Sequence, residues 1–160
     1  MKTWTSALRD ALVSGSSASI ASTAVLAATG KAETGHAFAA TNAISHWYWG
    51  QLATRRNRLS WRHTALGYLT HHGASVFWAT LYEKIFGERR AHTSAAVALA
   101  QAGAVAALAC FVDYRLTPAR LMPGYEQRLS RRSLAAVYAA FAAGLALGGA
   151  LLVVAADRRR

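Results

Sequence analysis

Residues 11–30 read ALVSGSSASIASTAVLAATG and carry no charged side chain. A run of about 20 uncharged, mostly apolar residues is long enough to cross a bilayer as a helix. Small side chains at four-residue spacing let another helix approach closely in lipid. Two such series occur here, one of Gly15, Ser19 and Thr23 and one of Ser14, Ala18 and Ser22. The stretch therefore predicts a membrane helix that packs inside a bundle.

The same stretch also has features of a secretory signal peptide, because Lys2 and Arg9 precede it and alanines surround Ala28. Its apolar core is long and rich in serine, however, which is unlike the short graded core of a signal peptide. A retained membrane span is therefore favoured over a cleaved leader.

The composition of the chain is that of a membrane protein. Of its 160 residues, 54% are hydrophobic and 16% are charged, and the mean hydropathy is +0.17. These values are too apolar for an ordinary soluble domain of this length. The formal net charge is +11, and the basic residues flank the apolar runs. The lipid bilayer and its anionic headgroups are therefore the expected partners, and no nucleic-acid-binding motif is present.

Three further apolar runs, at residues 64–82, 94–112 and 134–156, are long enough to span a membrane. With residues 11–30 they predict an all-α, polytopic protein, a four-transmembrane-helix bundle that forms one membrane domain over residues 1–160. Gly144 and Gly148 form a GxxxG pattern in the last run, which is typical of a close helix crossing. A membrane protein partner or a homo-oligomer is a further expectation.

Residues 36–53 form an additional apolar piece that ends in the aromatic cluster Trp47, Tyr48 and Trp49. Aromatic side chains of this kind gather at the level of the lipid headgroups. We expect an interfacial or re-entrant helix here, after the first span. The alternative is a fifth span, which would gather more Lys and Arg on one side of the membrane.

Two adjacent histidines, His71 and His72, fall in the middle of the second predicted span. An ionisable side chain at that depth is costly unless it faces the bundle interior or a wet cavity. Neighbours on a helix point about 100° apart, so the two imidazoles are not expected to serve one compact site. They could instead bond neighbours such as Ser75 or Gln101, ligate haem or a metal, or line a proton or substrate path, and the sequence leaves these alternatives open.

In the four-span arrangement, the loops after the first and third spans lie on the same membrane face. That face and the helix entering from it collect the candidate polar site, which comprises Asn42, His46, His63, His71, His72, Asp113 and Arg115. Asp113 ends the third apolar run, either as an interfacial stop with an ion pair in its own loop or as the partner of His63 or an arginine. No residue is predicted to be catalytic.

A basic cluster of Arg55, Arg56, Arg58 and Arg62 follows the aromatic residues. Arginines beside a membrane span are expected to bind the phosphates of lipid headgroups. The single cysteine, Cys110, lies in an apolar run and is expected to be a small hydrophobic residue. The sequence holds no GxSxG, nucleotide-binding loop or paired acidic motif, so an enzymatic activity has no support from motifs.

Three stretches carry a resemblance to known proteins: NAISHW at 42–47, RHTALGYLTHHGASVFWATLYEKIFG at 62–87 and VDYRLTPARLMPGYEQRLSR at 112–131. With them the chain resembles a group of small uncharacterised proteobacterial inner-membrane proteins. The resemblance implies a multi-pass protein of the bacterial inner membrane, and it implies no activity.

The sequence thus favours a structural or accessory membrane subunit with a polar site at one membrane face. Two other classes stay open. The six histidines would suit a redox protein with haem or a metal as its cofactor, and the polar residues inside the spans would suit a small transporter or channel component.

Overall fold

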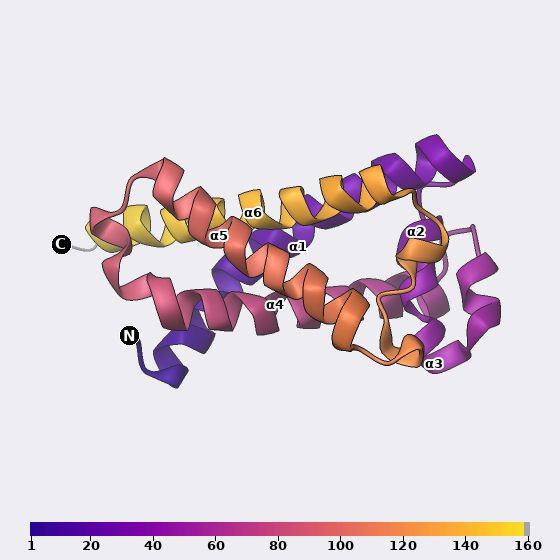
Figure 1. The fold of residues 1–160 in the computed structure, drawn as a ribbon, viewed down its shortest axis with the longest axis horizontal. Coiled ribbons are helices and arrows are strands. Elements are labelled where there is room, and N and C mark those ends of the chain that lie inside the picture. The colour runs from indigo at the N-terminus through magenta and orange to yellow at the C-terminus, as the bar shows by residue number, and fades with distance from the viewer. Residues whose placement is uncertain (159–160) are drawn as a thin grey trace.

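The computed structural model describes residues 1–158, and every regular element in that range is a helix or a helical turn (Figure 1). The fold has four long helices, α1 (Trp4–Thr34), α4 (Leu66–Phe86), α5 (Ala95–Phe111) and α6 (Arg131–Asp157). Long helices that follow one another in the chain run antiparallel. We call the end of the bundle with Met1 and the last turn of α6 the terminal end. The opposite end, with α2 (Ala39–Ile44) and α3 (His46–Trp49), is the loop end.

Short helical turns connect these helices. At the loop end they are η1 (Gln51–Arg55), η2 (Trp61–Ala65), η4 (Val112–Leu116), η5 (Ala119–Leu121) and η6 (Tyr125–Gln127), and at the terminal end η3 (Gly87–His92). The predicted all-α fold is confirmed for the described residues.

Three helical stretches are long and apolar enough to cross a membrane: Trp4–Thr34, Ala95–Leu116 and Arg131–Asp157. The first and the last contain the predicted spans 11–30 and 134–156. The second begins one residue after the start of the predicted span 94–112, because Ser94 is the N-cap of α5, and it extends beyond the end of that span. The predicted span at 64–82 forms most of helix α4, but it is not among these three because its polar residues lower its hydropathy. The structure is therefore that of a helical protein with three candidate spans.

Helix α1 is longer than the predicted span because its ends are set by capping rather than by hydropathy. The side chain of Thr3 accepts a hydrogen bond from the backbone N–H of Ser6 at 3.2 Å, which starts the helix before Asp10. Gly35 ends it with a left-handed φ of 77° and donates its N–H to the carbonyl of Lys31. The resulting helix has 31 residues.

The prediction of one interfacial or re-entrant helix over residues 36–53 is wrong in that the segment is not one helix, since α2, α3 and the start of η1 divide it. Helix α2 has six residues, all of them buried, and its Thr41 carbonyl lies so close to Gly67 of α4 that a side chain there would clash. At about 1.5 Å per residue, α2 is far too short to span a bilayer. The alternative of a fifth span is therefore not what the structure has.

The small residues of α1 make it the central helix, and it packs most extensively against α6 and α4. A Cβ added at Gly144 would lie 2.5 Å from the Cα of Ala18, and one at Gly148 would clash with the backbone of Ser14. On the other side of α1, a Cβ at Gly15 would lie 2.8 Å from the Cα of Val76. The predicted series with Ser14 and Ala18 on α1 and the predicted GxxxG pair on α6 thus meet at one close crossing.

The outer surface of the bundle is apolar along all four long helices. Large hydrophobic side chains are exposed on each of them, including Ile20 on α1, Phe77 on α4, Leu108 on α5 and Leu147 on α6. A surface of this kind is unusual for a soluble protein and suits contact with lipid. The polar groups are instead concentrated inside the bundle and at its two ends.

Candidate functional site

A cavity of about 240 Å³ lies between the long helices near the loop end, and residues 117–125 cover part of it. Most of its wall is apolar and aromatic, with Trp47, Trp78 and Phe141 among the lining side chains. Its polar groups come from α1, α4, α6, the turn η4 and the covering loop. Those that the following paragraphs use are Ser22, His71, Asp113, Tyr125 and Tyr138.

Asp113 is held in this cavity by Tyr138, which is itself bonded by Tyr125. The hydroxyl of Tyr138 on α6 donates to Oδ2 of Asp113 at 2.5 Å, and the hydroxyl of Tyr125 donates to that of Tyr138 at 3.3 Å. These contacts form a chain of donors that ends on one carboxylate oxygen. A carboxylate that accepts such bonds keeps lone pairs on its second oxygen for another donor.

Both predicted accounts of Asp113 are wrong in detail. The helical backbone does not stop at this residue, because α5 continues into the π-turn η4 as far as Leu116. Among the described residues Asp113 makes no ion pair, either in its loop or with His63. Its partner is a tyrosine from α6 that follows it by 25 residues.

Tyr125 enters the cavity from the covering loop. It is buried at 4% exposure and follows Gly124, whose φ of 92° and close approach to His46 and the Ala43 carbonyl leave no space for a side chain. Burial raises the pKa of the Tyr125 hydroxyl well above its ordinary value, and the neighbouring Tyr114 adds to the effect. The hydroxyl therefore remains a hydrogen-bond donor throughout the physiological pH range.

His71 lies on the same cavity wall. Its Nε2 is 2.8 Å from the hydroxyl of Ser22 on α1, and its ring meets that of Tyr125 edge-on at 6.4 Å between centroids. The imidazole does bond a neighbouring helix, but the expected partners, Ser75 and Gln101, are wrong. Ser75 instead donates its hydroxyl to the backbone carbonyl of His71 at 2.8 Å.

His72 is oriented differently from His71, as the 100° rotation between helix neighbours predicts. Its ring stacks on that of Tyr68 at 5.8 Å. It does not line the cavity, and its buried Nδ1 has no hydrogen-bond partner within residues 1–158. The two imidazoles therefore lie in different surroundings.

The other predicted site residues lie outside the cavity. Asn42 and His46 are buried beneath the loop end, where Nδ1 of His46 is 2.9 Å from the carbonyl of Ala43. His63 lies in η2, where its backbone N–H donates to the hydroxyl of the N-cap residue Ser60, and Arg115 is exposed on η4. Of the seven predicted residues, the structure brings only His71 and Asp113 to one cavity.

Sequence reasoning missed three residues whose side chains contact His71 or extend the hydrogen-bond chain to Asp113, namely Ser22, Tyr125 and Tyr138. Ser22 was recognised only as a small packing residue, and the tyrosines stand alone in a loop and in an apolar run. One available signal was Tyr138 itself, because a tyrosine inside a membrane helix needs a hydrogen-bond partner.

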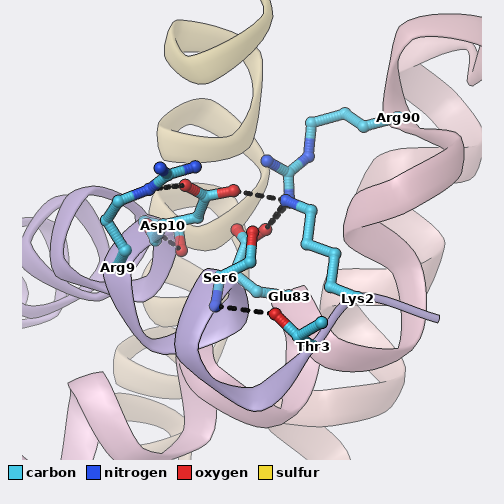
Figure 2. Close-up of polar contacts among 8 residues, drawn as sticks. Lys2, Thr3, Ser6, Arg9, Asp10, Glu83 and Arg90 are labelled. Carbon is cyan, nitrogen blue, oxygen red and sulfur yellow. Dashed lines mark hydrogen bonds and ion pairs between the residues drawn. The ribbon is translucent and has the colours of Figure 1, made fainter.

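A second polar cluster lies at the terminal end (Figure 2). Glu83 of α4 is fully buried, and its Oε2 accepts from Lys2 at 3.2 Å and from Arg90. Lys2 also pairs with Oδ2 of Asp10 at 2.5 Å, and Arg9 donates to the other oxygen of Asp10 at 3.3 Å. We call Lys2, Asp10, Glu83 and Arg90 the ionic cluster.

The ionic cluster joins three elements of the fold, α1, α4 and η3. The cluster holds two cations, Lys2 and Arg90, and two carboxylates, Asp10 and Glu83, so its charges neutralise one another. A Cβ added at Gly149 would lie 2.8 Å from Nε of Arg90, which shows how tightly α6 closes against it. Such an arrangement fixes helices relative to one another and leaves its charges little freedom to bind a ligand.

Within residues 1–158 no three side chains of His, Cys, Asp or Glu come together in a way that could hold a metal ion. Cys110 is free and half-buried. The fold and the cavity together define a helical protein with candidate membrane spans and an internal polar site. Comparison of the chain with models of protein families, with curated proteins and with solved structures finds no match.

Proposed function

We propose that the protein is a four-span membrane protein in which α4 is the fourth span. Its 21 residues give a length of about 31 Å, which matches the hydrocarbon thickness of a bilayer. Its most polar side chains point inward, since Glu83 is buried in the ionic cluster and His71 bonds α1. The exposed side chains Leu69, Phe77 and Ile85 are apolar and suit contact with lipid.

In this proposal, the protein acts as an accessory subunit that binds a small, mostly apolar molecule inside the membrane. We place it in the bacterial inner membrane, as the resemblance in residues 42–47, 62–87 and 112–131 implies. The single observation that carries the proposal is the cavity, because its apolar wall and its few convergent polar groups are typical of small-molecule sites.

The polar groups of the cavity define what such a molecule must offer. The free oxygen of Asp113 accepts a hydrogen bond, so the ligand should present an N–H or O–H group there. The aromatic side chains Trp47, Trp78 and Phe141 supply a flat apolar surface for the rest of the molecule. The ligand class that fits is an amphiphile with one small donor group.

The membrane topology can be tested with reporter fusions at both ends of the chain. Four spans place both ends on the same side of the membrane, whereas three spans place them on opposite sides. A cysteine introduced at Phe77, in a Cys110→Ser background, tests α4 directly. It should resist a membrane-impermeant thiol reagent in sealed vesicles and in vesicles opened to both sides, because lipid covers it.

The ligand can be tested by filling the cavity without touching its polar groups. The protein is purified from its native membrane, its bound small molecules are extracted, and they are identified by mass spectrometry. Ala109 lines the cavity, so Ala109→Phe should fold normally but lose the molecule. Ala104 is exposed on the same helix, and Ala104→Phe is the matched control that should retain it. Equal retention in both variants would argue against a ligand in this cavity.

A second candidate function is a component of a small transporter, and one observation favours it. The cavity brings together two titratable side chains, His71 and Asp113, inside a bundle with candidate spans. Paired titratable groups at such depth are typical of proton-coupled paths. In proteoliposomes, Asp113→Asn should then abolish a proton flux that Asp157→Asn leaves intact, while an accessory subunit would show no flux in either.

A further inference from the structure

The loop between α3 and α4 carries a basic surface pocket of about 400 Å³. Its lining consists of Arg55, Arg56, Asn57, Arg58, Ser60 and His63, with no carboxylate among them. None of the three arginines makes an ion pair within residues 1–158. Three arginines therefore line one pocket, and no carboxylate of the described residues pairs with them.

The backbone of this loop is held in place from beneath by Asn42. The side-chain N–H₂ of Asn42 donates to the carbonyl of Arg56 at 3.0 Å and to that of Arg58 at 2.9 Å. Its Oδ1 accepts from the hydroxyl of Thr64 at 2.6 Å. Because Asn42 is fully buried, one fixed amide sets the positions of two of the three arginines.

Arg128 fixes the other part of the loop. Its two terminal nitrogens donate to the carbonyl of Thr54 at 2.9 Å and to Oδ1 of Asn57 at 2.7 Å. Arg128 thus holds Thr54 and Asn57, which precede Arg58 in the loop. A loop anchored at both sides loses little further conformational freedom when a ligand binds, which favours affinity.

Arg62, the fourth member of the predicted lipid-binding group, is held elsewhere. Its guanidinium stacks 4.0 Å from the ring centroid of Trp49, and the indole N–H of Trp49 donates to its carbonyl at 3.0 Å. The basic cluster of the sequence therefore divides into three arginines that share a pocket and one that packs on an aromatic ring.

We propose that the pocket of Arg55, Arg56 and Arg58 is a specific site for a phosphate group. Guanidinium groups bind phosphate through paired, charge-assisted hydrogen bonds, and three of them can surround its oxygens. The phosphate comes either from an anionic lipid headgroup at the membrane surface or from a soluble phosphate compound. The inference does not depend on the cavity, which is formed by other residues.

The test measures saturable binding to the full chain in a non-ionic detergent by native mass spectrometry. The probes are dioctanoyl phosphatidic acid, dioctanoyl phosphatidylcholine and inorganic phosphate. Phosphatidic acid should bind more tightly than phosphatidylcholine, whose choline offsets the phosphate charge. Binding of phosphatidic acid without inorganic phosphate indicates a lipid site, and equal binding of the two indicates a site for soluble phosphate.

Variants separate a built site from general attraction to positive charge. The triple variant Arg55→Gln, Arg56→Gln, Arg58→Gln should lose at least about tenfold in affinity, because it removes the charge-assisted bonds. The control triple variant Arg115→Gln, Arg120→Gln, Arg131→Gln removes the same charge from exposed positions at the loop end and should stay within about twofold. Equal losses in the two variants, or no saturable binding of any probe, would overturn the proposal.

Asn42→Ala tests the positioning of the arginines at constant charge. It should weaken phosphate binding severalfold while circular dichroism shows an intact helical fold. If Asn42→Ala does not fold, Thr64→Val gives a milder test. It removes the Thr64 hydroxyl, which donates to Oδ1 of Asn42 and accepts from the backbone N–H of Ser60, and it leaves the amide of Asn42 in place. Unchanged affinity in a folded variant would show that the loop is not a preorganised site.

Discussion

The hydroxyl of Tyr138 donates to Oδ2 of Asp113 at 2.5 Å, and this bond ties α6 to the π-turn that follows α5. The same hydroxyl accepts from Tyr125 of the covering loop. Tyr138 is therefore the shared member of the chain of hydrogen bonds, and the cavity wall depends on it from two sides.

Replacing Tyr138 by Phe should leave Asp113 without its donor and Tyr125 without its acceptor. We expect a loss of about 1–3 kcal/mol in the free energy of unfolding, the usual result of leaving buried polar groups unpaired. Unfolding in mixed detergent micelles measures it. Tyr68→Phe is the control, because the Tyr68 hydroxyl makes no hydrogen bond within residues 1–158. Similar losses for both variants would contradict this account.

Gly148→Ala should separate α1 from α6 at their crossing. The added methyl group has no space beside Ser14, and we expect a destabilisation of about 1–3 kcal/mol from overpacking. Gly103→Ala is the matched change on α5, where the added Cβ would meet no atom within 4 Å. It should stabilise the helix by about 0.5–1 kcal/mol. The unfolding temperatures of both variants measure this. If both changes shift the unfolding temperature in the same direction, the result argues against the close crossing.

Glu83→Gln should be the most damaging conservative change at the terminal end. Lys2 and Arg90 would then face each other without the carboxylate that both contact. Breaking a buried ion pair from one side costs about 3–5 kcal/mol. The double variant Glu83→Gln, Arg90→Met should recover part of this loss. Asp157→Asn, at an exposed position, is the control, and chemical unfolding of all three variants decides the point.

Ser22 and His71 should be energetically coupled, because their side chains are 2.8 Å apart. A double-mutant cycle with Ser22→Ala and His71→Phe should give a coupling energy of about 0.5–1.7 kcal/mol, the range seen between membrane helices. The same cycle with His72→Phe in place of His71→Phe should give a coupling near zero, because the His72 ring stacks on Tyr68 instead. A larger coupling for His72 would contradict the assigned orientations.

The stability of the loop end should depend on pH through His63. Burial, together with the positive charges of Arg56 and Arg62, lowers the pKa of His63 below its ordinary value of 6.5. As the pH falls through that value, the unfolded chain binds a proton that the folded chain resists, so stability decreases. The decrease in stability ends once the pH is below the pKa of His63 in the folded protein. His63→Asn should remove this part of the slope between pH 8 and 5, measured as the difference from the parent protein, and an unchanged slope would count against it.

The sequence was sufficient for the main helices because their signals are local. Length and hydropathy identify apolar runs, and the spacing of Gly144 and Gly148 identifies a helix crossing within one segment. The segment at 36–53 was harder, because tertiary contacts bury the residues of α2, whereas Tyr48, Trp49 and Leu52 are exposed. Hydropathy alone does not distinguish these two environments.

The candidate site was less predictable because its contacts join distant parts of the chain. Ser22 and His71 are 49 residues apart, and Lys2 and Glu83 are 81 residues apart. A sequence shows which polar side chains fall in apolar runs, and this identified His71 and Asp113 as residues in need of partners. It does not show which helix supplies the partner, since that depends on how the helices rotate and pack.

The central position of α1 has a consequence for how the protein is made. Ribosomes produce α1 before α6, yet the closest approaches to Gly144 and Gly148 of α6 come from Ala18 and Ser14 of α1. The serine-rich face of α1 is therefore synthesised before the helix that packs against it. This crossing forms only after α6 has been made, and a chain arrested before that point would leave the face uncovered.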